Sequence, residues 1–316
     1  MRNISEQLVT RPLVSVLMNC YNGEPYLKEA VDSVLAQSYE NWELIFWDNQ
    51  STDRSAALFK SYSDQRLKYF YAPEHSNLSE ARAIAFQHLT GEYVAVLDTD
   101  DLWRPQKLER QIDFFQSKTG RASHLVLLGT GYRLINEQGE PITQLIPPTT
   151  IEEVRVAMAE ANPFGNSSVM FHRESARCQG GYDQRFVFAN DFDLWLKLFT
   201  IGNGAVLPEC LTDIRIVSTS LTRTPQYKLA FAHETLALYQ RAAQQFSDDP
   251  RARQASQKAF ARSGFAYGQA LLQAGHRLEG WRWLAWALGH NPVVFFKEWL
   301  RPWKQFLQRR WPKAQS

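Results

Sequence analysis

The chain has 316 residues, of which 44% are hydrophobic and 22% are charged, so it is long enough for two globular domains or one large domain with an appendage. Its net charge of +2 gives no indication of nucleic-acid binding, and it contains no run of about 18 apolar residues that would predict a membrane span. Three scattered cysteines form neither a disulfide framework nor a metal motif, and residues 1–11 lack the apolar core of a signal peptide, so we expect a cytoplasmic protein.

Strands and helices alternate over the first hundred residues. Apolar strands are predicted at 13–18, 42–47 and 67–71, and the intervening segments carry helical spacing, for example Leu27, Val31 and Val34. This alternation is typical of right-handed βαβ units, which build a parallel sheet with flanking helices. The sequence therefore predicts an α/β fold.

The next strand runs into three carboxylates. Residues 93–97 are apolar or aromatic, and Asp98, Asp100 and Asp101 follow within four residues. Ligands bind open parallel sheets beyond the carboxyl ends of the strands, and like charges this close repel unless a cation neutralises them. A divalent cation with oxygen ligands would do so. The alternative is an acidic turn that caps the helix after Pro105, and the stretch alone does not separate the two.

The middle of the chain mixes short elements. A strand is predicted at 125–128, a flexible turn at 129–131, a hairpin over 132–142, a helix at 149–158 and a strand at 166–171. A helix then begins near Asn190, the predicted cap, because aromatic residues recur at helical spacing from 188 to 199. Asp191 lies in its first turn, where an acid either complements the helix dipole or acts chemically.

From residue 226 the pattern is helical. A helical hairpin is predicted from 263–273 and 280–288, and six of the ten tryptophans follow residue 280. Residues 293–312 interleave aromatic and basic side chains, so this end either contacts a membrane surface or packs on the rest of the protein. We divide the chain into a tail (1–10), a catalytic domain (11–225) and a helical region (226–316).

Three motifs in register resemble family 2 glycosyltransferases. They are the opening strand with Asn19-Cys20-Tyr21-Asn22, the loop Asp48-Asn49-Gln50-Ser51-Thr52-Asp53, and the segment 91–101 with its Asp-X-Asp pattern. The resemblance covers about the first 115 residues. It implies the GT-A fold, a Rossmann-like mixed sheet with flanking helices, here with a small C-terminal helical region. It also implies a nucleotide-sugar donor and Mn²⁺ or Mg²⁺. For the acidic stretch, this favours a metal site over a helix-capping turn.

The resemblance also implies roles for individual residues. It places Asn19, Tyr21, Asp48, Arg82, Asp98, Thr99 and Arg215 at the nucleotide sugar, with Asp48 on the base, and it assigns the metal to Asp100 and Asp98. Asp101 is expected to orient the loop. Asp191 matches the catalytic base of the family, which takes the proton from the acceptor hydroxyl.

The sequence departs from the family pattern at four places. Asn49-Gln50 replaces the usual Asp-Gly, Ala83 stands where Asn is common, Asn190 replaces a Glu, and Val217 stands where the family's closing segment often has a histidine. The missing histidine removes one contact to the diphosphate or metal, for which Arg223 or His233 could substitute. The missing glycine at position 50 bears on the exact turn of that loop.

These observations predict an inverting glycosyltransferase in surface polysaccharide or glycoconjugate synthesis. Its expected partners are a nucleoside-diphosphate sugar, with UDP favoured, and a glycan or lipid-linked acceptor, at the cytoplasmic face of a membrane or in the cytoplasm. Two alternatives stay open. One is a catalytically weak sugar-nucleotide binder, which the departures from the pattern suggest. The other is a nucleotidyltransferase-like enzyme, although Asn19-Cys20-Tyr21-Asn22-Gly23 is not the Gly-rich phosphate loop that such enzymes favour.

Overall fold

The computed structural model describes residues 11–218 and 225–301, and these ranges form two compact units. The first unit comprises residues up to 151 together with 164–217, and the second comprises 152–163 together with the residues from 218 on. The segment 152–163 thus groups with the C-terminal helices. The division into domains 11–225 and 226–316 remains a proposal, and the tail (1–10) and the last part of the aromatic and basic stretch (302–312) lie outside the described residues.

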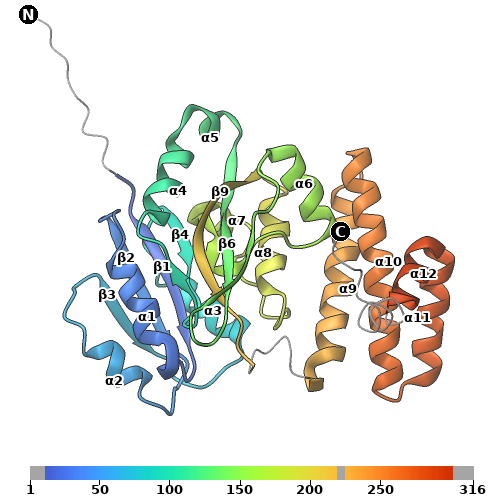
Figure 1. Ribbon diagram of the computed structural model, residues 1–316, viewed down its shortest axis with the longest axis horizontal. Helices are drawn as coiled ribbons and strands as arrows, with labels where there is room; N and C mark the ends of the chain where they lie inside the picture. Colours follow the sequence, from blue (N-terminus) through green and yellow to red (C-terminus); the bar gives the residue numbers. More distant parts are fainter. Residues whose placement is uncertain (1–10, 219–224, 302–316) are drawn as a thin grey trace, which may run out of the picture. The chain divides into compact units, whose positions relative to one another are not determined.

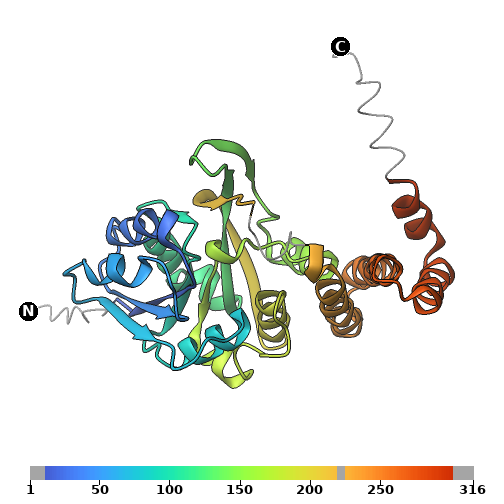
Figure 2. The same cartoon turned by 90° about the horizontal axis from the view of Figure 1, so that it is seen from below.

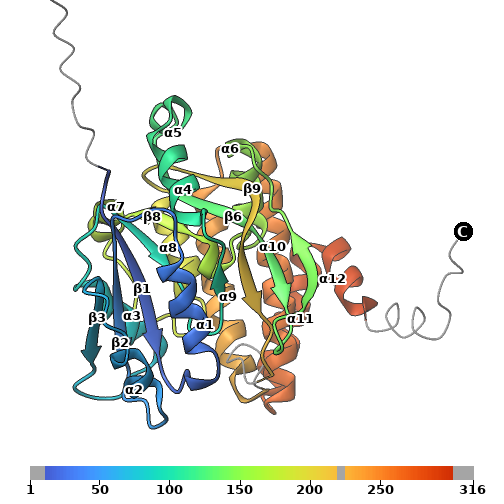
Figure 3. The same ribbon diagram turned by 60° about the vertical axis from the view of Figure 1, so that its left-hand side comes forward.

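The first unit is built on one nine-stranded mixed sheet (Figures 1 and 3). Its strand order is β3-β2-β1-β4-β8-β6-β9-β5, and β7 pairs with β6 outside this path. The strands are β1 (Val14–Cys20), β2 (Trp42–Asp48), β3 (Leu67–Tyr71), β4 (Tyr93–Val96), β5 (Leu102–Trp103), β6 (Leu125–Ile135), β7 (Pro141–Leu145), β8 (Met170–His172) and β9 (Asn203–Arg215).

The first four strands of the path are parallel, as the βαβ pattern predicts. β1 pairs in parallel with β2 and β4, and β2 pairs in parallel with β3. The second half of the sheet is mixed, because β8 runs antiparallel to both β4 and β6 whereas β6 and β9 are parallel. The prediction of a GT-A-like mixed sheet with flanking helices is confirmed.

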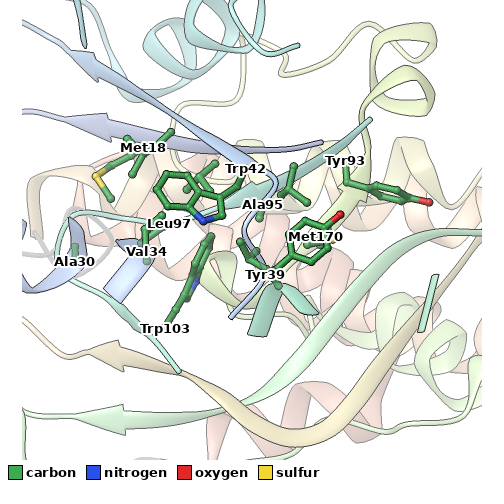
Figure 4. Packing of buried hydrophobic residues seen from close by; sticks show 14 of the residues in the cluster. Met18, Ala30, Val34, Tyr39, Trp42, Tyr93, Ala95, Leu97, Trp103 and Met170 are labelled. Carbon is green, nitrogen blue, oxygen red and sulfur yellow. The ribbon is translucent and has the colours of Figure 1, made fainter. Parts of the chain in front are cut away.

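Helices cover both faces of the sheet in the first unit. They are α1 (Glu24–Leu35), α2 (Ser55–Lys60), α3 (Leu78–Phe86), α4 (Lys107–Gln116), α5 (Lys118–Ala122), α7 (Arg173–Cys178) and α8 (Asn190–Leu198). Apolar residues of α1, α2 and α4 pack with alternate residues of β1 and β2 into one buried cluster. Figure 4 shows Met18, Trp42, Leu97 and Trp103, from four separate segments, within it.

The opposite face of the sheet carries α3 and α8. Phe86 of α3 stacks on Phe171 of β8 with ring centroids 6.4 Å apart, and Phe171 also meets Trp195 of α8 at 5.5 Å. Strand β4 is therefore buried on both faces, as its unbroken apolar run predicts. Arg82 of α3 bonds both Asp98, which follows β4, and Asn190 at the start of α8, so the two helices are joined at the carboxyl end of β4.

Three local predictions are wrong. Residues 129–131, predicted as a flexible turn, lie inside β6. The glycines there make room for neighbouring atoms, because a Cβ at Gly129 would lie 2.6 Å from the Phe164 ring and one at Gly131 would lie 2.9 Å from the Pro208 carbonyl oxygen. Of the strand predicted at 166–171, only Met170 and Phe171 belong to a strand, β8, and Asn166–Ser168 forms a 3₁₀ turn instead. The cap of α8 is Ala189 rather than Asn190.

The second unit is helical. Its helices are α6 (Ile151–Glu160, whose first residue belongs to the first unit), α9 (Lys228–Gln245), α10 (Pro250–Gln273), α11 (Arg277–His290) and α12 (Pro292–Trp299), preceded by a 3₁₀ turn at Pro225–Tyr227. Figure 2 looks along several of them. The predicted helical hairpin is confirmed, with Gly275 at φ +89° in its turn. Helices α10 and α11 approach closely at Gly268, which has no side chain. A Cβ atom there would lie 3.0 Å from the carbonyl oxygen of Gly280.

No helix within 11–218 and 225–301 combines the length and the apolarity needed to cross a bilayer.

Gly91, which precedes β4, tests how tightly β1 and β4 pack. A Cβ atom there would lie 2.6 Å from both the Leu13 carbonyl oxygen and the Ser15 amide nitrogen, and backbone atoms of a paired strand cannot move away cheaply. We expect Gly91→Ala to lower the free energy of unfolding of the first unit by about 1–3 kcal/mol in denaturant titration.

Gly289, in α11, is the matched control because a Cβ atom there would meet no other atom within 4 Å and its φ is negative. Gly289→Ala should leave stability unchanged or raise it by about 0.5–1 kcal/mol. Wild-type stability in Gly91→Ala would contradict the packing described here.

Candidate functional site

The candidate site lies at the carboxyl ends of β1, β2 and β4. Loops 20–23, 49–54 and 97–101 follow these three parallel strands and therefore emerge at one edge of the sheet. Such an edge is where open α/β sheets bind ligands. Helix α3 begins beside it, with Asn77 as a cap whose side chain accepts from the Ser79 and Glu80 amides.

Asp98 is held by two donors from distant parts of the chain. One carboxylate oxygen accepts from the Arg82 guanidinium at 2.7 Å and the other accepts from the Asn166 side-chain amide at 2.8 Å. Its side chain is about one-third exposed, at 34%. The carboxylate is thus fixed in direction but still reachable from solvent.

Asp101 organises the acidic loop. It is buried, accepts from the Ser167 hydroxyl at 2.5 Å and accepts from the Arg215 amide at 2.8 Å. The same Ser167 hydroxyl oxygen accepts a hydrogen bond from the backbone amide of Asp98 at 3.0 Å. Burial raises the pKa of Asp101 well above its usual range, and the neighbouring Asp100 and Asp98 add to the rise. These contacts agree with the predicted role of Asp101 in orienting the loop.

Asp100 is the carboxylate of this loop that the protein leaves least compensated. Among the described residues no other residue donates a hydrogen bond to its side chain. Its pKa is raised from 3.8 to about 6, because burial, followed by the neighbouring Asp98 charge, raises it more than the Arg215 and Arg82 charges lower it. A cation beside Asp100 would remove this penalty.

The donor set fits a cation that is shared with a ligand. In the described part of the chain, no three His, Cys, Asp or Glu side chains converge as a complete metal cage. Mg²⁺ and similar cations in phosphate-handling sites use one or two protein carboxylates and take their other ligands from phosphate and water. Asp100, with Asp98 beside it, offers this pattern. The alternative of a helix-capping turn is not supported, since α4 begins after Gln106 and no side chain caps it.

Arg82 connects the acidic loop to α8. It is 5% exposed, and its guanidinium donates to Asp98 at 2.7 Å and to the side-chain oxygen of Asn190 at 2.8 Å. The side-chain amide of Asn190 donates in turn to the Val187 carbonyl at 3.1 Å. The residue expected to cap α8 therefore serves as a neutral acceptor for Arg82.

Asp191 follows Asn190 in the first turn of α8. Burial raises its pKa above the usual range, the nearby positive charge of Arg82 lowers it, and Asp98 adds a smaller rise. Asp191 and Asp98 thus lie within electrostatic reach of the same guanidinium. A carboxylate with a raised pKa is suited to accept a proton near neutral pH.

Asp48 has a structural task in this site. It is fully buried; one oxygen accepts the Ser51 amide at 2.8 Å and the other accepts the Tyr69 hydroxyl at 2.6 Å. Burial raises the pKa of Tyr69, and the bond to Asp48 adds to the rise. Asp48 therefore shapes the loop after β2, and its contact with a nucleotide base stays a prediction.

The departure at Asn49-Gln50 keeps the turn that a glycine would form. Gln50 has φ +65°, and its side-chain amide donates to the carbonyl oxygens of Ala72 and Pro73 at 3.3 and 3.0 Å. The side-chain amide of Asn49 donates to the Ser76 carbonyl at 2.7 Å. Both side chains therefore fasten the loop between β3 and α3 to the site.

The loop between β3 and α3 also places the His75 ring beside the Tyr21 ring, just after β1. His75 lies 4.5 Å from the ring of Tyr21, and its Nδ1 donates to the Asn49 carbonyl at 2.8 Å, because a carbonyl oxygen only accepts. Tyr21 is 53% exposed. Beside them, both amide atoms of the Asn19 side chain are buried and lack a hydrogen-bond partner within the described residues. Buried polar atoms without a protein partner are satisfied by bound water or by a ligand.

Arg215 links the acidic loop to two other segments of the chain. Its side chain is 1% exposed and donates to the carbonyl oxygens of Asp100 and Glu137 at 3.0 Å each and to the Glu29 carboxylate at 2.8 Å. It also lies over the Tyr26 ring. The structure thus places Arg215 behind the acidic loop rather than at an open ligand surface.

The other predicted residues are placed as follows. Thr99 lies at the turn of the acidic loop beside Gly23, where an added Cβ would meet its hydroxyl at 3.1 Å. Val217 is half-buried after β9, and Arg223 lies outside the described residues. His233 belongs to α9 of the second unit, where it meets Tyr267.

Sequence reasoning missed Asn166, Ser167 and His75. The apolar pattern predicts strand through Asn166-Ser167-Ser168, although three small polar residues after Gly165 are typical of a turn that offers side-chain donors. The β3–α3 loop contains Pro73, His75 and Asn77. Its local signals are this cluster of turn-forming residues and the capping box Asn77-Leu78-Ser79-Glu80, which starts α3 and does not point to His75.

Asp100 yields a stability prediction. Because its pKa is raised from 3.8 to about 6, its burial lowers stability as the pH rises through that range. We expect Asp100→Asn to stabilise the ligand-free protein at pH 7 by about 1–3 kcal/mol in thermal unfolding, with the gain absent at pH 4.

Asp98→Asn is the matched control in the same loop, since Asp98 is ion-paired with Arg82. That substitution should destabilise at pH 7, because it leaves a buried guanidinium without its countercharge. Equal destabilisation by the two variants would refute the distinct environments of the two carboxylates.

Solved structures share this fold. TarS from S. aureus in complex with UDP-GlcNAc superimposes with a TM-score of 0.64 at 16% identity, covering 90% of this chain and 80% of TarS. The mannosyltransferase PcManGT from Pyrobaculum calidifontis, in complex with GDP-Man and Mn²⁺, gives a TM-score of 0.63 at 20% identity, covering 97% of this chain and 89% of PcManGT.

Sequence comparison is more specific. Residues 15–132 match the model of glycosyl transferase family 2. The glycosyltransferase EpsE of Bacillus subtilis is 34% identical over 67% of this chain and 76% of EpsE. The teichuronic acid biosynthesis glycosyltransferase TuaG of the same species is 34% identical over 67% of this chain and 82% of TuaG. On this similarity and the fold that carries it, the chain belongs to glycosyl transferase family 2 and is a glycosyltransferase.

Proposed function

We propose that this protein transfers a sugar, with inversion, from a nucleoside-diphosphate sugar to a hydroxyl group of a glycan or lipid-linked acceptor in cell-surface polysaccharide synthesis. The observation that carries the proposal is the buried Arg82, which bonds both Asp98 of the acidic loop and Asn190 at the start of the helix that carries Asp191. One cationic side chain thereby ties a donor side and a base side into one site.

The donor proposal draws on the relatives and on the sheet edge. TarS was solved with UDP-GlcNAc and with UDP, PcManGT was solved with GDP-Man, and TuaG is named for teichuronic acid biosynthesis. We favour a UDP-sugar here. Asn19, with its unpaired amide, and the exposed ring of Tyr21 would contact the nucleoside. Thr99 and Asp98 would lie toward the ribose and diphosphate.

The acidic loop would hold Mn²⁺ or Mg²⁺ through Asp100, with Asp98 beside it. When bound, the cation supplies positive charge that offsets the charge developing on the leaving nucleoside diphosphate. The residues of this chain prepare that place: Ser167 and the Arg215 amide fix Asp101, and the Arg215 guanidinium holds the Asp100 carbonyl. Arg215 is thus a positioning residue in this proposal, and a direct contact with the nucleotide sugar is not part of it.

Asp191 would act as the base. The acceptor oxygen attacks the anomeric carbon, the bond from that carbon to the phosphate oxygen breaks, and its electron pair leaves with the nucleoside diphosphate. The acceptor proton passes to the Asp191 carboxylate. Attack opposite the departing group inverts the anomeric centre, and it uses two carboxylate groups, Asp100 and Asp191, for two separate tasks.

The departures from the family pattern do not favour the alternative of an inactive binder. Gln50 keeps the positive φ of the turn, and Asn190 gives Arg82 a neutral acceptor without placing a second charge beside Asp191. The half-buried Asp191 carboxylate, with its raised pKa, is suited to proton transfer. A nucleotidyltransferase-like reaction would give this carboxylate no comparable role.

Asp191→Asn tests the base directly. Because the amide cannot accept the proton, we expect donor hydrolysis and transfer to fall by about 10²–10⁴-fold. Stabilisation of the fold by UDP with Mn²⁺, measured by thermal shift, should persist.

Asp193→Asn, two positions along α8, is the control carboxylate: it is fully buried and paired with Lys197 at 2.7 Å. It should cost stability while the surviving folded protein keeps its turnover. Undiminished turnover in Asp191→Asn would remove Asp191 from the mechanism.

The Arg82 charge predicts a pH effect. A base works only when ionised, so activity falls as the pH drops through the pKa of Asp191, and the Arg82 charge lowers that pKa. In Arg82→Met the acid limb of kcat/KM should therefore move to higher pH.

Arg66→Met, which breaks a pair with Asp64 at the other end of the strands, should leave the acid limb where it is. An unmoved acid limb in Arg82→Met would mean that another group sets it.

A further inference from the structure

Helices α11 and α12 each expose a row of large apolar side chains. Among the described residues fourteen large hydrophobic side chains are exposed, and seven of them lie between 278 and 300. On α11, Leu278, Trp281 and Leu288 follow one another at helical spacing. On α12 and the residue after it, Val293, Phe296 and Leu300 do the same. We call these six residues the α11–α12 surface.

These side chains are exposed because the opposite sides of the two helices are already packed. Leu284 and Ala287 of α11 are buried against Phe265 of α10. Phe295 of α12 meets the Phe265 ring at 5.3 Å. The inward faces thus complete the helical unit, and helix α12 contributes no fully buried residue. The outward apolar row is additional to what the unit needs for its own core.

The charge of this end of the chain is strongly biased. Residues 277–316 carry eight lysines and arginines against two acids, whereas residues 1–276 carry 27 against 31. In the described part, four cations (Arg277, Arg282, Lys297 and Arg301) accompany the apolar side chains against two acids, Glu279 and Glu298, and Glu298 is paired with Arg301. Cations beside exposed tryptophan and aliphatic side chains suit an interface that is apolar inside and anionic at its rim.

This bias separates the candidate occupants. A second copy of the chain on the same face would bring two strongly cationic segments together, which electrostatic repulsion opposes. An acidic lipid surface offers both the apolar layer and the countercharge. Neither helix is long and apolar enough to cross a bilayer, so the contact would be with the surface of the membrane.

We propose that the α11–α12 surface binds the headgroup and upper acyl region of bilayers that contain anionic lipid. The helices lie in the interface, Trp281 and Phe296 insert, and the neighbouring cations pair with lipid headgroups. This binding does not depend on the proposed chemistry of the first unit, and it would bring that unit to lipid-linked acceptors.

The test is co-sedimentation of the full chain with phosphatidylcholine vesicles, with and without phosphatidylglycerol. We expect binding to the anionic vesicles that weakens as salt is added. Trp281→Ser combined with Phe296→Ser should weaken it by about tenfold or more. Arg282→Glu combined with Lys297→Glu should do the same. Both pairs are on the outward side of the helices, so the melting temperature should not change.

The matched control is Ile142→Ser combined with Ile146→Ser in the first unit. These residues are 55% and 56% exposed, against 56% for Trp281 and 54% for Phe296. Wild-type vesicle binding is expected for this control. The proposal is overturned if the chain binds neither type of vesicle, or if the control variant loses binding to the same extent. It is also overturned if Trp281→Ser with Phe296→Ser instead abolishes a dimer detected by light scattering. Donor hydrolysis by the same variants, measured without vesicles, reports separately on the proposed function.

Discussion

The site depends on one buried guanidinium. Arg82 is almost completely buried, and a buried charge is tolerated only when an opposite charge or hydrogen-bond acceptors compensate it. Its partners are Asp98, after β4, and Asn190, at the start of α8. Because Asp98 follows β4 and Asn190 is the first residue of α8, these two contacts hold the acidic loop and the helix that carries Asp191 together. The Arg82 charge also lowers the pKa of Asp191, which burial raises.

The acidic loop shows how a site can oppose the stability of its own fold. Three carboxylates lie within four residues, and the protein satisfies two of them with internal donors: Arg82 and Asn166 for Asp98, Ser167 and the Arg215 amide for Asp101. Asp100 keeps a raised pKa. This unequal treatment is understandable if the third carboxylate is reserved for a ligand, since a carboxylate already satisfied by the protein would bind a cation less well.

Much of the fold follows from local sequence, and the parts that do not have physical reasons. The parallel strands and the helical hairpin are predictable from hydrophobic periodicity, and the acidic loop is predictable from its carboxylates. The link from Arg82 to Asn190 spans 108 residues and has no local signature. Gly129 and Gly131 suggest a turn because glycine is frequent in turns, yet they serve close packing inside β6. Asp48 matches a motif, but only the structure reveals its burial.

The central claim is that a donor phosphate and an acceptor hydroxyl meet between Asp100 and Asp191. A crystal grown with UDP and Mn²⁺ and measured at the manganese absorption edge tests it most directly. We expect one anomalous peak within coordination distance of Asp100, with the diphosphate beside it and the Asp191 carboxylate facing the same cavity. An anomalous peak elsewhere, or an Asp191 side chain directed away from the diphosphate, would contradict it.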